Sequence, residues 1–255
     1  MTMTPLLPHR RAGRGMPLVL IHGYLGGSKQ WAQEIAHFSK HFDVIAPALP
    51  GFAEATDLPA CERIGDMADA IIELLDQLDL TEFVLLGHSM GGMIAQEIAA
   101  KVGKRVLGLI LYGTGPLGLL PNRFEPIEIS RERLMADGVE ATSRRIGATW
   151  FRDGEAAAAF EMVASIGAAT SREAALAGLD AMAHWDGRPA LRDLEMPTLI
   201  LWGELDQSYR WGQIEILWRT LPNAQLAILP GTSHAAHLEK PKLFKAILED
   251  FLSDK

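Results

Sequence analysis

A serine flanked by glycines, in Gly87-His88-Ser89-Met90-Gly91, is the strongest chemical signal in the chain. It lies between an apolar run that ends at Leu86 and a helical pattern that begins at Met90. On such a strand-to-helix turn a serine hydroxyl points out of the sheet, and glycines avoid clashes within the turn. The helix start also offers free backbone amides to a developing negative charge. We therefore predict that Ser89 is a nucleophile.

A serine hydroxyl is a weak nucleophile, so it needs a base within hydrogen-bond reach and a carboxylate that orients the base. Two other apolar runs lead into residues of these types. Residues 198–202 precede Asp206, and residues 225–229 precede His234. The order Ser89, Asp206, His234 along the chain is the one expected of a nucleophile-elbow hydrolase. We predict that these three residues form a catalytic triad.

Other acids and histidines lie close to the predicted triad in the sequence. Glu204 is an alternative acid, and His237 is an alternative base. We prefer His234 because it falls in a loop, whereas His237 falls where the last helix should begin. His22 and His88 lie in an apolar strand and in the serine turn, so we interpret them as hydrogen-bonded framework residues.

The segment His22-Gly23-Tyr24-Leu25-Gly26-Gly27 follows the first central strand. We predict that a backbone amide here, that of Tyr24, pairs with the amide of Met90. The two would hold the oxyanion that forms when Ser89 attacks a carbonyl group. The Tyr24 side chain either lines the substrate pocket or packs in the core.

Short apolar runs alternate with amphipathic segments along the chain. This alternation predicts an α/β fold with a mostly parallel central sheet flanked by helices. The predicted strands are 18–22, 44–46, 83–86, 106–112, 198–202 and 225–229. The predicted helices between and after them are 28–40, 61–78, 90–101, 209–220 and 237–252.

One region interrupts this alternation. Residues 115–195 show no convincing strand pattern but contain helix candidates at 130–136, 139–150, 155–166 and 170–183. Thr170 and Glu173 have capping-box spacing, which predicts a helix start at Thr170. The run Ala156 to Ala159 is composed of a good helix former. We expect a core domain formed by residues 1–114 and 196–255, and an all-helical domain formed by residues 115–195.

Composition narrows the choice of partners. The chain has 255 residues with 24 Lys and Arg against 32 Asp and Glu, a net charge of −8. This balance argues against nucleic acids and anionic membranes, which are held mainly by basic residues. The single cysteine, Cys61, can form neither an intramolecular disulfide nor a cysteine-based metal site. We expect a cytoplasmic monomer or homodimer that acts on a small molecule and needs no metal or cofactor.

The motifs together resemble the α/β-hydrolase superfamily. The resemblance rests on the His-Gly turn, the Ser89 elbow, the stretch 202–206 and the stretch 231–241. It implies that residues 115–195 are a helical cap, inserted after family strand six, which supplies most substrate contacts. The N-terminus is too short for the usual first hairpin, so the sheet should begin near residues 7–12 and have seven strands rather than eight. The loop 48–55 departs from the family pattern. That pattern has two glycines here, and this chain has only the first of them, Gly51.

The resemblance also limits the reaction. Relatives that attack haloalkanes or epoxides carry Asp at the elbow, whereas this chain carries Ser89. The elbow looks most like that of enzymes that hydrolyse a small ester, lactone or amide in a catabolic pathway. Hydrolysis of a carbon–carbon bond in a ring-cleavage product is an alternative. Two alternatives to a hydrolase exist on the same fold. One is a cofactor-free oxygenase or haloperoxidase, and the other is a ligand-binding receptor.

Basic residues of the expected cap are all arginines. They are Arg123, Arg131, Arg133, Arg144, Arg145, Arg152, Arg172, Arg188 and Arg192. Arginine's planar fork suits a carboxylate. One interpretation is that they cover solvated helix faces. The other is that Arg144, Arg145 and Arg152, close to Trp150 in the sequence, point over Ser89 and bind an anionic substrate.

Overall fold

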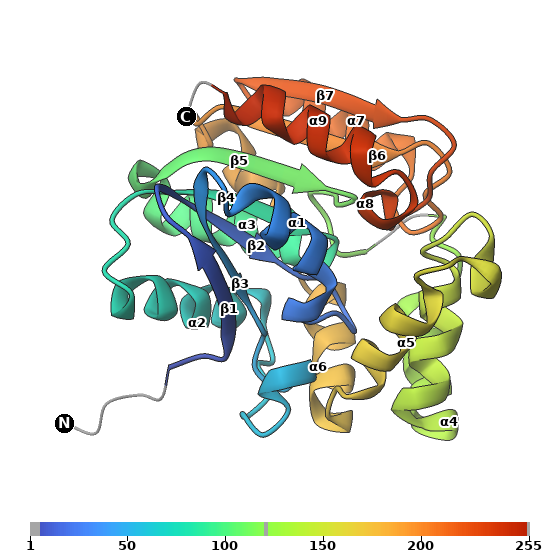
Figure 1. The fold of residues 1–255 in the computed structure, drawn as a ribbon. Helices are drawn as coiled ribbons and strands as arrows, with labels where there is room; N and C mark the ends of the chain where they lie inside the picture. The colour runs from blue at the N-terminus through green and yellow to red at the C-terminus, as the bar shows by residue number, and fades with distance from the viewer. Residues whose placement is uncertain (1–5, 120–121, 254–255) are drawn as a thin grey trace.

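Within the residues that the computed structural model describes, 6–119 and 122–253, the strands form one seven-stranded sheet in the order β1-β3-β2-β4-β5-β6-β7 (Figure 1). Their bounds are β1 His9–Gly13, β2 Met16–Ile21, β3 Phe42–Pro47, β4 Phe83–His88, β5 Val106–Tyr112, β6 Thr198–Gly203 and β7 Ala224–Leu229. Only β1 is antiparallel to its neighbour, with His9 opposite Pro47 of β3. The predicted mostly parallel sheet of seven strands is confirmed.

Side chains of the central strands alternate between two apolar cores. In β2, Leu18 and Leu20 contribute to one core, whereas Val19 and Ile21 contribute to the other. The helices that cover these faces are α1 Ala32–Phe38, α2 Ile64–Gln77, α3 Met90–Val102, α7 Trp211–Thr220, α8 Ala236–Glu239 and α9 Pro241–Leu252. Buried residues of α1 and α9 join the first core, and those of α2, α3 and α7 join the second. Burial on both faces explains why the strand sequences are almost continuously apolar.

The segment between β5 and β6 is helical in its described part, and we refer to it as the cap. Its helices are α4 Ile127–Ala148, α5 Phe160–Ala168 and α6 Arg172–Ala183. They group together at one end of the sheet (Figure 1). Within residues 6–119 and 122–253 the first strand is β1, and with the strand numbering that the resemblance implies, β5 corresponds to family strand six, after which the cap was expected. The domain bounds at 115 and 195 stay a prediction.

Two local predictions in the cap are wrong. The side chain that caps α6 is Ser171, whose hydroxyl accepts from the Ala174 amide at 3.1 Å, and not Thr170. The alanine run is not continuous α-helix, because a 3-10 turn ends at Ala156 and Ala157 is extended, with ψ of 136°. Intrinsic propensity is weak, and the next helix begins only at Phe160, whose side chain is fully buried.

Short 3-10 helices connect several elements. They are Ser28–Trp31, Ala53–Ala55, Gly103–Arg105, Gly154–Ala156 and Arg188–Asp193. The second of them belongs to the loop 48–55. There Gly51, with φ of +82°, accepts from the Ser171 amide at 2.9 Å, so the loop packs directly against the cap. In the described part of the chain no helix is both long and apolar enough to cross a membrane.

Candidate active site

Ser89 lies between the end of β4 and the start of α3, in a backbone conformation that is rare for a residue with a side chain. Its φ is +58° and its ψ is −121°. A Cβ atom at Gly87 would lie 2.2 Å from the Gly91 carbonyl oxygen, and one at Gly91 would lie 2.5 Å from the His22 carbonyl oxygen. Only glycine fits these two positions, so the motif forces the turn that lifts Ser89 out of the sheet.

Asp206 and His234 form a buried pair at the ends of β6 and β7. The Nδ1 atom of His234 lies 2.8 Å from Oδ2 of Asp206, and both side chains are at most 1% exposed. The other carboxylate oxygen, Oδ1, accepts from the amides of Ser208 at 2.7 Å and Tyr209 at 3.1 Å. Asp206 is therefore held as an acceptor that orients the imidazole. Nε2 of His234 is buried and has no hydrogen-bond partner among the described residues.

The alternative acid and base occupy other environments. Glu204 is exposed, and its Oε2 accepts from the Gly231 amide at 2.8 Å. His237 is buried against Tyr112, with 3.0 Å between Nδ1 and the phenol oxygen. Burial lowers the pKa of His237 to about 3, so the ring is neutral. Neither side chain is part of the Asp206–His234 pair.

His22 and His88 make the bonds expected of framework residues. Nε2 of His22 accepts from the Leu49 amide at 3.0 Å, which leaves Nδ1 to donate to the Gly23 carbonyl at 2.8 Å. Burial lowers the pKa of His22 to about 4. Nε2 of His88 lies 3.0 Å from the carbonyl oxygen of His234, within hydrogen-bond distance. These rings connect the site to its supporting loops.

The glycine-rich loop after β2 runs beside the nucleophile. A Cβ atom at Gly23 would lie 2.8 Å from Cβ of Ser89, so the backbone passes directly over the serine. Gly23 and Gly26 close a turn through a 3.0 Å hydrogen bond, with Tyr24 and Leu25 between them. Met90 is the first residue of α3, where an amide has no partner within the helix. This arrangement suits an oxyanion site formed by the Tyr24 and Met90 amides.

A cavity of about 20 Å³ brings these elements together. Its lining combines Ser89, His234 and Tyr24 with Trp150 from the cap. The Tyr24 side chain both lines the cavity and packs in the protein interior, where its hydroxyl donates to the Ala175 carbonyl of α6 at 2.9 Å. A cavity of this size has room for about one water molecule. The cap therefore packs closely over Ser89.

Two further lining residues were not singled out from the sequence. Tyr209 stacks on His234, with ring centroids 5.7 Å apart and planes 14° apart. Burial raises the pKa of its phenol, and the neighbouring Ser89 hydroxyl opposes that rise. Arg123, at the entry to the cap, also lines the cavity. Tyr209 lies three residues after Asp206, which is the only sequence signal that could have drawn attention to it.

The three arginines favoured from the sequence do not line this cavity. Arg144 pairs with Glu161 at 2.9 Å and with Glu155 at 3.2 Å. Arg152 is exposed and pairs with Asp153 at 3.0 Å. The third, Arg145, forms an ion pair with Glu125, as described below. Their placement does not support the expectation that they point over Ser89, because each of them pairs with an acidic residue and none of them lines the cavity. Trp150 does line the cavity.

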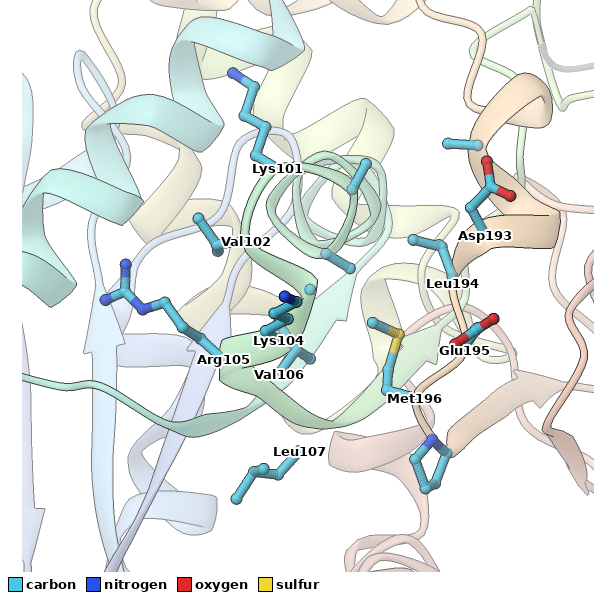
Figure 2. Close-up of a pocket in the computed structure, with 15 residues that line it drawn as sticks. Lys101, Val102, Lys104, Arg105, Val106, Leu107, Asp193, Leu194, Glu195 and Met196 are labelled. Atoms are coloured by element: carbon cyan, nitrogen blue, oxygen red, sulfur yellow. The ribbon is translucent and has the colours of Figure 1, made fainter.

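A much larger hollow lies at the other end of the sheet. Its volume is about 950 Å³, and it is lined by residues 99–107, 190 and 193–197 (Figure 2). Lys101, Lys104 and Arg105 contribute to it from one side, and Asp193 and Glu195 from the other. It adjoins the amino ends of β5 and β6, whereas Ser89 follows the carboxyl end of β4. No serine or histidine is among its lining residues.

Among the described residues, no group of three or more His, Cys, Asp or Glu side chains is arranged to hold a metal ion.

Known proteins provide an independent comparison. A "Putative carbamate hydrolase RutD" from Pseudomonas savastanoi pv. phaseolicola is 26% identical over 252 residues, which cover 96% of this chain and 97% of that protein. A "Pimeloyl-[acyl-carrier protein] methyl ester esterase" from Legionella pneumophila is 26% identical, with coverage of 94% and 96%. The structure of a thermophilic esterase from Thermogutta terrifontis, with malate bound, superposes with a TM-score of 0.88 at 27% identity, with coverage of 97% and 93%.

The family itself is shown by a match over most of the chain. A model of the alpha/beta hydrolase family matches residues 18–247, which include the elbow, the cap and both loops of the Asp206–His234 pair. With esterases among its relatives, the chain is a hydrolase of the carboxylic ester hydrolase type. The chain belongs to the alpha/beta hydrolase family.

Proposed function

We propose that this chain is a serine hydrolase that cleaves a small ester, lactone or amide through an acyl-enzyme. Ser89 is the nucleophile, His234 the general base, and Asp206 the residue that orients the base. The observation that carries the proposal is the buried 2.8 Å contact between His234 Nδ1 and Asp206 Oδ2, beside a cavity that His234 shares with Ser89. An oriented histidine with a free Nε2 next to a serine is the arrangement that activates a hydroxyl.

The first half of the reaction forms the acyl-enzyme. Ser89 Oγ attacks the carbonyl carbon while its proton passes to Nε2 of His234. Asp206 accepts from Nδ1 of His234 and stabilises the imidazolium that results. The amides of Tyr24 and Met90 donate to the oxyanion of the tetrahedral intermediate. When this intermediate collapses, the bond to the leaving group breaks and His234 returns the proton to the leaving oxygen or nitrogen.

Water completes the reaction along the same route. His234 takes a proton from the water as its oxygen attacks the acyl carbon. The second tetrahedral intermediate releases the carboxylic acid, and the proton returns to Ser89. The descriptions of the relatives, a carbamate hydrolase and a methyl ester esterase, support a carbonyl substrate with an oxygen or nitrogen leaving group.

The test is turnover of p-nitrophenyl acetate and butyrate by the wild type, by Ser89→Ala and by the control Ser253→Ala. Ser253 is an exposed serine near the C-terminus. We expect repeated turnover by the wild type and the control, and a loss in kcat on the order of a millionfold for Ser89→Ala. Intact-mass measurement with a fluorophosphonate should show one adduct on the wild type and none on Ser89→Ala.

Other outcomes would favour the alternatives. More than about a hundredth of wild-type activity in Ser89→Ala would show that another residue is the nucleophile. Labelling of Ser89 without repeated turnover would favour a ligand-binding receptor. Hydrolysis of a vinylogous diketone but of no ester in the panel would favour a carbon–carbon bond hydrolase.

A further inference from the structure

Arg123 lines the cavity above Ser89 and is held in place by neutral acceptors. Its Nη1 donates to the Glu125 carbonyl oxygen at 2.8 Å and to the Ser130 hydroxyl at 2.9 Å. The guanidinium lies over the Phe124 ring, 4.0 Å from the ring centroid. Among the described residues, no acceptor bonds to its Nε or Nη2, and no carboxylate forms an ion pair with it. The edge of the guanidinium that best matches a carboxylate is thus free.

The carboxylate nearest in sequence is already used by other groups. Oε1 of Glu125 accepts from Ser130 at 2.6 Å and from Arg145, and Oε2 accepts from Arg133 at 3.1 Å. The Glu125 carboxylate therefore forms ion pairs with both Arg133 and Arg145. Arg123 adds a further positive charge beside this carboxylate. The cluster carries three positive charges against one negative charge, so two positive charges are not neutralised within it. Arg123, which has no ion pair among the described residues, borders the cavity.

The surroundings of Arg123 make this charge costly in the absence of a ligand. Burial lowers the pKa of its guanidinium, against smaller opposing effects that include Glu125. The charge acts on both cavity tyrosines, since it lowers the pKa of Tyr24 and of Tyr209 against the larger effect of their burial. An anion that entered the cavity would supply the missing partner.

The segment that carries Arg123 is tied to the loop of Asp206. The Phe124 amide donates to the Gln207 carbonyl at 3.0 Å, and Nε of Arg210 donates to the Asn122 carbonyl at 3.1 Å. The backbone around Arg123 is thus anchored to the Asp206 loop by one backbone bond and one bond from the Arg210 side chain. The guanidinium itself is held by the Glu125 carbonyl and the Ser130 hydroxyl.

We propose that Arg123 binds a carboxylate of the substrate, so that the preferred substrates are esters, lactones or amides that carry a free carboxylate within reach of the scissile carbonyl. This inference rests on the proposed function of Ser89 and extends it to the class of substrate. The carboxylate bridges the Nε and Nη2 hydrogens of Arg123. That contact holds the scissile carbonyl over Ser89, so its main effect is on KM for the charged substrate.

The test compares two esters of nearly equal length, monomethyl glutarate and dimethyl glutarate, by methanol release at pH 7. The first carries a carboxylate where the second carries a neutral ester. We expect the wild type to favour monomethyl glutarate by tenfold or more in kcat/KM. Arg123→Gln should lose this preference through a rise in KM for the monoester, with less than a twofold change for dimethyl glutarate. Arg123→Lys should recover part of the preference, because a single ammonium keeps the charge but lacks the fork.

The matched control is Arg152→Gln, which removes the same charge from an exposed cap residue outside the cavity. Its preference for the monoester should equal that of the wild type. Two results would overturn the proposal. One is a wild type with no preference for the monoester. The other is an Arg123→Gln variant in which both esters lose kcat/KM equally, as expected if Arg123 only holds Glu125 and Ser130 in place.

A binding measurement separates this proposal from the proposed function. Calorimetry with glutarate needs no turnover, and we expect Arg123→Gln to weaken glutarate binding tenfold or more relative to the wild type, while glutaramide binds weakly to both. This result would stand even if the wild type failed to turn over p-nitrophenyl butyrate, in which case only the hydrolase proposal would fail. Equal glutarate binding by both proteins would overturn the role of Arg123. Tighter binding of inorganic phosphate than of glutarate would overturn the carboxylate assignment.

Discussion

At the residue scale, the two carboxylate oxygens of Asp206 have different hydrogen-bond partners. Oδ1 is held by the amides of Ser208 and Tyr209, and Oδ2 contacts Nδ1 of His234. The carboxylate is thereby fixed by its own loop before it orients the imidazole. Glu204 lies on the same loop but is exposed and contacts the Gly231 amide. Burial and orientation, rather than residue type, separate the two acids.

We expect Asp206→Asn to lower kcat for p-nitrophenyl acetate about 10⁴-fold, because an amide in this place favours the wrong tautomer of His234. Glu204→Gln is the matched control, since its amide oxygen can still accept from Gly231. It should retain wild-type kcat. A larger loss in Glu204→Gln than in Asp206→Asn would exchange the roles of the two acids.

At the element scale, α1 buries an acid without a partner. Glu34 is 0% exposed, and neither of its carboxylate oxygens has a hydrogen-bond partner among the described residues. Burial raises its pKa from 4.5 to about 7, against a smaller opposing effect of Lys245 from α9. The helix is thus kept in place by its apolar neighbours, and its acid is accommodated best when it is protonated.

This burial predicts an unusual dependence of stability on pH. Between pH 4.5 and about 7 the folded state holds a proton on Glu34 that the unfolded state has lost, so this group lowers the free energy of unfolding as the pH rises. The full effect is about 3 kcal/mol above pH 7. Glu34→Gln should match the wild type near pH 4.5 and be more stable at pH 8, as measured by urea unfolding.

Glu215→Gln is the control for this prediction, because Glu215 lies on α7 and pairs with Arg219 near the surface. It should keep the pH dependence of the wild type. An unchanged difference between Glu34→Gln and the wild type at the two pH values would show that Glu34 does not titrate in this range.

At the scale of the whole molecule, the cap closes directly on the catalytic loops. The carbonyl of Trp150 accepts from the Ala235 amide at 2.8 Å, next to His234. The Trp150 ring lies 5.5 Å from the His234 ring and lines the cavity of about 20 Å³. The indole is thus one of the groups that limit the volume of the cavity next to His234.

We expect Trp150→Ala to raise kcat/KM for p-nitrophenyl octanoate relative to the acetate by about tenfold, equivalent to about 1.4 kcal/mol, because it removes the largest cap side chain over the site. It should also lower the free energy of unfolding by roughly 3 to 5 kcal/mol, as expected for a buried tryptophan. Trp218→Ala, at a residue that is 42% exposed on α7, is the control and should change neither quantity. An unchanged ratio of octanoate to acetate would show that Trp150 does not limit the acyl pocket.

The sequence by itself determined the parts of the site that depend on local structure. The glycines around Ser89 force one turn, and the ends of parallel strands meet at one edge of the sheet. Ser89, Asp206 and His234 could thus be placed together from strand order and loop position alone. Six of the seven strands followed from the alternation of strands and helices, since burial on both faces makes such strands easy to recognise. The remaining strand, β1, was expected near residues 7–12 only from the family resemblance.

Only the tertiary structure decided which arginine faces the site. Nine arginines of the cap are equivalent in the sequence, which left two interpretations open: solvated helix faces, or an anion site formed by Arg144, Arg145 and Arg152, which are close to Trp150 along the chain. In space these three meet acidic partners on Glu161, Glu125 and Asp153. Arg123 is left without such a partner and lines the cavity. The direction of a long side chain depends on how helices pack and on which charges come within reach, and neither is encoded in the local pattern of residues.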